Sequence, residues 1–83
     1  MTIEQLNYQL CKVFLAVFKT RSASQAATEL GLSNSAVSRA LASLRSMYDD
    51  PLFIRTQTGF NPTEKAADIA PRIVELVSLF RKI

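Results

Sequence analysis

The side chains with the clearest chemical potential lie in one polar stretch around and after Gly31. Between Leu30 and Tyr48 the chain carries two arginines, Arg39 and Arg45, and no carboxylate. Hydroxyl, amide and guanidinium groups donate hydrogen bonds to phosphate oxygens and base edges, whereas a carboxylate would repel phosphates. The stretch therefore suits a polyanion such as nucleic acid. An ordinary solvated helix face is the alternative.

Helical periodicity places these groups on one face of a predicted helix that runs from Asn34 to about Met47, with Ser33 as its N-cap. Its apolar stripe recurs at three- and four-residue steps and comprises Val37, Leu41, Leu44 and Tyr48. The opposite face, with Asn34 and Arg45 on its flank, carries Ser35, Ser38, Arg39, Ala42 and Ser46.

A shorter helix is predicted just before this one, from about Ser24 to Leu30. Ser22 and Ser24 are both candidates for its N-cap, and Gln25 is spaced for a capping box with Ser22. A short helix, a turn that contains glycine and a longer helix form a helix-turn-helix pattern, here over residues 22–41. In that unit the second helix enters the major groove with its first residues facing the bases.

Two further segments flank this unit. Upstream, an apolar helical face comprises Leu6, Leu10, Val13, Phe14, Val17 and Phe18. Downstream, residues 52–62 predict a short β-hairpin with its turn at Gly59, which is a wing whose tip reaches DNA backbone or the minor groove. Alternatively, the hairpin only closes the core with Leu52 and Phe53, and both interpretations can hold together.

A last helix is predicted from a cap at Thr63 towards Ile83, with Pro71 either bending it or marking a new start. Its seven-residue apolar seam comprises Ala66, Ile69, Ile73, Leu76, Phe80 and Ile83. A second apolar row comprises Ala70, Val74 and Val77. We expect one side to cover the core near the first helix and the other to pair two copies. The alternative is that all of it packs within one chain.

Composition excludes several classes of protein. The 83 residues allow one small domain, and the net charge of +3 is compatible with nucleic acid. Without histidine and with one cysteine, the usual zinc sites, an internal disulfide and His-dependent catalytic groups are excluded. The longest apolar run, residues 13–18, is far shorter than the about 20 residues of a membrane span. We therefore expect no enzyme, cofactor, metal or membrane association, and a reducing cytoplasmic setting.

The order of these motifs resembles a known family. The resemblance rests on the runs Ser22-Ala23-Ser24-Gln25-Ala26-Ala27, Leu30-Gly31-Leu32-Ser33 and Ala36-Val37-Ser38-Arg39. It continues through Leu41, Leu44, Pro51-Leu52-Phe53, Arg55 and Pro62-Thr63. In this combination the chain resembles the N-terminal domain of LysR-type transcriptional regulators. The resemblance implies a mostly α winged helix-turn-helix, with a three-helix core, a short hairpin wing and a long linker helix.

The resemblance also implies a division of roles. Residues 1–62 would bind double-stranded DNA, and residues 63–83 would form the linker and dimerisation helix. Together with the face derived above, it predicts DNA contacts at Ser24, Gln25, Ser33, Asn34, Ser35, Ser38, Arg39, Ala42, Arg45, Arg55, Thr56, Gln57 and Thr58. The dimerisation residues are expected to be Ile69, Ile73, Leu76, Phe80 and Ile83. The family often has Gln-Pro at positions 34 and 35, basic residues at the wing tip and glycine at position 66, and this chain differs at all three.

The expected partners follow from the same resemblance. They are an operator with paired half-sites and a second copy of the chain, with higher assembly in the full-length protein. An effector-binding C-terminal domain of two α/β subdomains is expected outside this chain. The rival interpretation is a small helical interaction module whose Arg39 and Arg45 meet an acidic protein.

Overall fold

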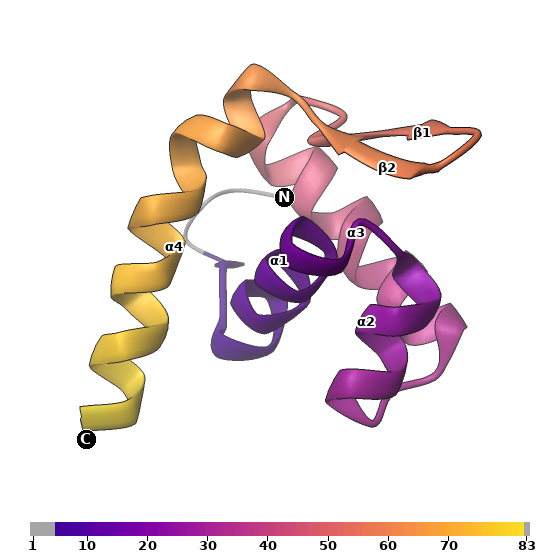
Figure 1. Ribbon diagram of the computed structural model, residues 1–83. Helices are drawn as coiled ribbons and strands as arrows, with labels where there is room; N and C mark the ends of the chain where they lie inside the picture. Colours follow the sequence, from indigo (N-terminus) through magenta and orange to yellow (C-terminus); the bar gives the residue numbers. More distant parts are fainter. Residues whose placement is uncertain (1–4, 83) are drawn as a thin grey trace.

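The computed structural model describes residues 5–82. Its elements in chain order are α1 (Tyr8–Thr20), α2 (Ala23–Leu30), α3 (Asn34–Tyr48), β1 (Phe53–Thr56), β2 (Gly59–Pro62) and α4 (Glu64–Lys82). Figure 1 shows α1 in the middle, with α2 to one side, α4 to the other and the hairpin projecting outwards. The predicted mostly α fold, with a three-helix core, a hairpin and a long last helix, is confirmed.

Polar side chains define where the helices begin. In each helix a side-chain oxygen accepts a hydrogen bond from a first-turn backbone N–H: Asn7 for α1, Ser22 for α2, Ser33 for α3 and Thr63 for α4. Ser22, rather than Ser24, is thus the cap of α2 and accepts from the Gln25 N–H at 3.2 Å. The capping box is wrong in its second half, because the Ser22 N–H donates to Thr20 Oγ1 at 3.2 Å instead.

The core forms around α1, which packs against α2, α3 and α4. The largest fully buried side chains come from α1, α3, β1, α4 and the segment before β1, and they include Phe14, Leu44, Leu52, Phe53 and Ile73. The rings of Phe14 and Phe53 lie 5.3 Å apart between centroids, so the first strand of the hairpin is fixed to the central helix. The expectation that Leu52 and Phe53 close the core is therefore confirmed.

The hairpin occupies the predicted segment. Its strands pair antiparallel, from Phe53 opposite Pro62 to Thr56 opposite Gly59. Gly59 has a φ of +129°, and a Cβ there would lie 2.5 Å from the Arg21 carbonyl oxygen. The next residue, Phe60, donates its N–H to that same oxygen at 2.9 Å. Glycine at position 59 thus allows the hairpin to bond directly to the end of α1.

The last helix divides its apolar residues between two environments. It continues without a break through the exposed Pro71. Ile69 and Ile73 are buried within the chain, and α4 packs on α1, so their prediction as partner-facing residues is wrong. Leu76 and Phe80 remain 39% and 46% exposed, and the Phe80 ring lies 5.0 Å from that of Tyr8. Ile83 lies outside the described residues.

Candidate nucleic-acid interface

The outward face of α3 is polar and open. Its apolar stripe of Val37, Leu41 and Leu44 is buried, which directs the opposite face to solvent. The predicted contact residues on that face are all exposed: Ser33, Asn34, Ser35, Ser38, Arg39 and Ala42. Within the part of the chain that the structure describes, Arg39 makes no hydrogen bond or ion pair. Its guanidinium is therefore available to a ligand, and Ala42 leaves room for close approach.

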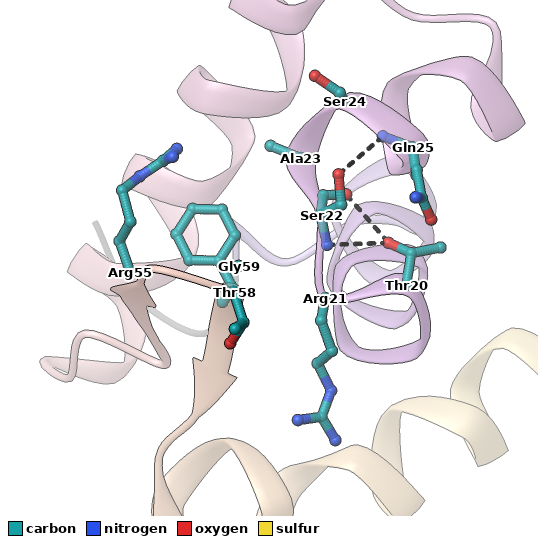
Figure 2. A pocket seen from close by; sticks show the side chains of 10 residues that line it. Thr20, Arg21, Ser22, Ala23, Ser24, Gln25, Arg55, Thr58 and Gly59 are labelled. Atoms are coloured by element: carbon teal, nitrogen blue, oxygen red, sulfur yellow. Dashed lines mark hydrogen bonds between the residues drawn. The ribbon is translucent and has the colours of Figure 1, made fainter.

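A cleft of about 320 Å³ separates the start of α2 from the hairpin. Figure 2 shows Ser24 and Gln25 on one side of it and Arg55 and Thr58 on the other. The structure therefore brings four predicted contact residues, from two segments that are far apart in sequence, to one opening. Thr56 and Gln57 are exposed at the hairpin tip and do not line the cleft.

The hairpin holds its own tip in place. The Thr56 hydroxyl donates to the Gly59 carbonyl at 2.9 Å, and the Thr58 N–H donates to Thr56 Oγ1 at 3.3 Å. Arg55 lies over the Phe60 ring, with its guanidinium carbon 4.8 Å from the ring centroid. This contact restricts the Arg55 side chain, and the residue as a whole remains exposed. An arginine of this kind can meet a phosphate at a reduced cost in side-chain entropy.

Arg45 lies in a different environment from Arg39. Its Nε donates to the Pro51 carbonyl at 2.8 Å, and one terminal nitrogen donates to the Phe53 carbonyl at 3.3 Å. The side chain is half-buried and already engaged by the segment between α3 and β1. Of the two arginines on this helix, only Arg39 stands free of the protein.

Sequence reasoning gave no contact role to six of the residues that line the cleft, which are Thr20, Arg21, Ser22, Ala23, Gly59 and Phe60. Arg21 has a φ of +59° at the end of α1, and its Nε donates to the Phe18 carbonyl at 2.7 Å. The Arg21 carbonyl accepts the hydrogen bond from the Phe60 N–H of the second strand. In the sequence, Arg21 is recognisable only as a basic residue just before the N-cap of α2. Its contact with Phe60 could not be predicted, because the two residues are almost forty positions apart.

The Cys11 thiol is buried, and burial raises its pKa, so it remains protonated at neutral pH. Among residues 5–82, no group of three or more Cys, Asp or Glu side chains is placed to hold a metal ion. No helix within that range is long and apolar enough to cross a membrane.

A helix-turn-helix with a hairpin wing and a carboxylate-free second helix defines a winged-helix protein of the nucleic-acid-binding class. The family described as "Bacterial regulatory helix-turn-helix protein, lysR family" matches residues 8–67. The chain belongs to this family, and it is a LysR-type helix-turn-helix DNA-binding domain. The rival interpretation as a general protein-interaction module is thereby disfavoured.

Individual relatives agree with this assignment. The chain is 38% identical over 81 residues to the HTH-type transcriptional activator NahR of Pseudomonas putida, covering 98% of this chain and 27% of NahR. It is 36% identical over 78 residues to the HTH-type transcriptional regulator PhcA of Ralstonia nicotianae, covering 94% of this chain and 22% of PhcA. The chain thus spans 22% to 27% of the length of these two regulators.

Solved structures give the same fold. The probable transcriptional regulator PA0477 from Pseudomonas aeruginosa superposes with a TM-score of 0.87 at 34% identity, over 96% of this chain and 27% of that one.

Proposed function

We propose that this chain binds double-stranded DNA sequence-specifically, with α3 in the major groove. The observation that carries the proposal is the exposed α3 face from Ser33 to Ala42, which has a free arginine and no carboxylate. Arg39 has the reach and the paired donors to read a guanine edge, and the small Ser35, Ser38 and Ala42 permit close approach. Asn34 supplies the amide for an adenine edge.

The cleft beside the wing fits the sugar-phosphate backbone in this proposal. Ser24 and Gln25 supply polar groups at the start of α2, where the helix dipole favours negative charge. Arg55 supplies the positive charge from the other side. The uncharged tip residues Thr56, Gln57 and Thr58 contribute less, because they neutralise no phosphate.

The exposed face of α4 supports a second part of the proposal, the pairing of two copies. Residues 1–62 would then bind DNA and residues 63–83 would join the subunits, although the first half of α4 also fills the core. The large apolar side chains that α4 leaves exposed are Val74, Leu76, Leu79 and Phe80. A two-fold pair of this kind reads paired half-sites about one helical turn apart.

The lengths of the relatives extend the proposal to the whole protein. We propose that a longer regulator carries this domain, with an effector-binding domain beyond it and higher assembly through that domain. Such a regulator acts at DNA in the bacterial cytoplasm and nucleoid and catalyses no reaction. The support is family membership, since the relatives are transcriptional regulators.

Selection of bound duplexes from a randomised pool tests the central proposal. We expect recovery of one consensus sequence, and an affinity for it that falls steeply with salt and exceeds that for random duplexes by at least about a thousandfold. Binding that shows salt dependence without sequence preference would contradict sequence-specific recognition. Absence of duplex binding would contradict the proposal altogether.

Sedimentation of the chain tests the pairing. Leu79 is 58% exposed, so Leu79→Asp should leave the fold intact and shift a dimer towards monomer. Ala67→Asp, at another exposed position of α4, is the matched control and should leave the assembly unchanged. Ile73→Asp is unsuitable here because it would place a charge in the core. A chain that stays monomeric both at high concentration and on DNA would contradict pairing.

A further inference from the structure

The connection between α3 and the wing contains an unfavourable backbone conformation. Leu52 is fully buried and has a φ of +62°, a region that side chains other than glycine rarely adopt. The Phe53 N–H donates to the Pro51 carbonyl at 2.6 Å, which closes a three-residue turn around Leu52. Such a turn persists only where neighbouring groups hold it in place.

Two charged side chains hold this turn from opposite ends. The Asp50 carboxylate accepts the Leu52 N–H at 2.8 Å and the Thr63 hydroxyl at 2.7 Å, which connects the turn to the start of α4. The Arg45 guanidinium donates to the carbonyls of Pro51 and Phe53, which connects the turn to α3. Among the side-chain hydrogen bonds of the described residues, only those of Arg45 join α3 to the first residue of β1.

Resting on the proposed function, we infer that Arg45 is a positioning residue, which sets the wing relative to α3 and thereby places Arg55 against the DNA backbone. Arg55 follows Phe53 by two positions on β1, or about 7 Å along the strand. A displacement of the Phe53 carbonyl is therefore transmitted directly to Arg55. The Phe53 ring holds the first strand against α1 and the Phe60 N–H holds the second strand to Arg21, so neither contact sets the hairpin relative to α3 as Arg45 does.

The geometry favours positioning over a direct phosphate contact. Arginine presents its N–H donors in a fixed fork, and here that fork spans two carbonyl oxygens of one turn. Lysine would keep the positive charge but lack the planar guanidinium that donates to both carbonyls. A direct phosphate contact would survive Arg45→Lys to a large extent, whereas positioning would not.

A double-mutant cycle with Arg55 measures the effect on DNA. The probe is a duplex that this chain selects from a randomised pool. We expect Arg45→Gln and Arg45→Lys each to weaken binding about tenfold alone and less than about twofold when Arg55 is already alanine. Arg72→Gln removes a charge from an exposed position of α4 and should leave the affinity for the duplex unchanged, both with Arg55 present and with alanine in its place. The inference would be overturned if the Arg45 variants lost equal affinity with and without Arg55. It would also be overturned if Arg45→Lys kept full affinity, or if neither Arg45 variant lost affinity.

Amide hydrogen exchange of the free chain separates the inference from the proposed function. In Arg45→Gln, we expect faster exchange at the Phe60 and Thr63 amides, which bond the wing to Arg21 and Leu52, with unchanged exchange at the buried Leu41. Unchanged wing exchange would overturn the inference even if DNA binds. If the unmodified chain binds no duplex, the proposed function fails, and the placement of Arg55 against DNA fails with it.

Discussion

The helices α3 and α4 each bury one apolar stripe, yet their exposed faces differ in chemistry. The face of α3 is small and polar and contains no carboxylate. The face of α4 mixes both signs of charge, with three exposed carboxylates among four exposed basic side chains, and it also exposes large apolar side chains such as Leu79. A face without carboxylates lets phosphate approach, whereas exposed large apolar side chains favour contact with another protein surface. The two faces therefore suit different partners, DNA for α3 and protein for α4.

The comparison also shows that an apolar stripe alone does not tell core from interface. Ile73 and Leu79 both lie in the apolar part of α4, with exposed fractions of 1% and 58%. The difference arises because α1 lies against only one side of α4. The inward side stabilises the fold, and the outward side is left for association.

The largest effect is expected from truncation on the inward side of α4. Ile73→Ala removes buried methyl groups beside α1 and should lower the free energy of unfolding by about 2–5 kcal/mol. Leu79→Ala, on the outward side, should change it by less than about 0.5 kcal/mol. Denaturant unfolding at low protein concentration, where association contributes little, measures both. Similar losses for the two variants would remove the distinction between the two sides.

The next effect sharpens the contrast between the exposed faces. Arg39→Ala should cost about 1–3 kcal/mol of binding to the selected duplex and less on random duplexes, because the lost contact is to a base edge. Arg72→Ala removes the same charge from the exposed face of α4 and should cost little on either duplex. Equal losses for Arg39→Ala on both duplexes would assign Arg39 to phosphate, and no loss would contradict the placement of α3.

Local signals explain why α2 and α3 could be predicted closely from the sequence. Ser33 caps α3 at the predicted position, and the helix ends at Tyr48, one residue beyond the predicted Met47. Helical periodicity also separated the buried Val37 and Leu41 from the exposed face. Caps and periodicity act within a few residues, so they can be read from a single sequence.

The orientation of α4 and the role of Arg45 depend on distant segments and could not be predicted in the same way. The buried residues of α4 combine parts of both predicted apolar rows: Ala66, Ile69, Ala70, Ile73 and Val77. Which combination is buried depends on where α1 lies. Likewise, Arg45 has the spacing of an exposed flank, and only the turn at Leu52 brings two carbonyls within its reach.

A smaller effect tests whether the cap maintains the α3 face. The Ser33 hydroxyl accepts the Ala36 N–H at 3.0 Å, so Ser33→Ala should lower the free energy of unfolding by about 1 kcal/mol. Ser46→Ala changes the same residue type at an exposed position inside α3 and should have little effect or be slightly stabilising. Thermal unfolding distinguishes the two, and equal midpoints would show that the cap is dispensable.

The smallest effect is expected from Thr58 in the wing, and its comparison with Arg55 sets a limit on the DNA-binding face. Arg55→Ala removes the charge that lies over Phe60, so the slope of log affinity against log salt should fall by about one unit if that charge meets a phosphate. Thr58→Ala removes a neutral hydroxyl from the same cleft and should leave the slope unchanged, with only a slight loss of affinity. Titrations with the selected duplex at several salt concentrations compare the two variants.

A slope that is unaffected by Arg55→Ala would confine electrostatic recognition to α3, because Arg39 would then be the only remaining free arginine on the proposed contact face. A large loss from Thr58→Ala would instead show that the uncharged tip takes part in recognition.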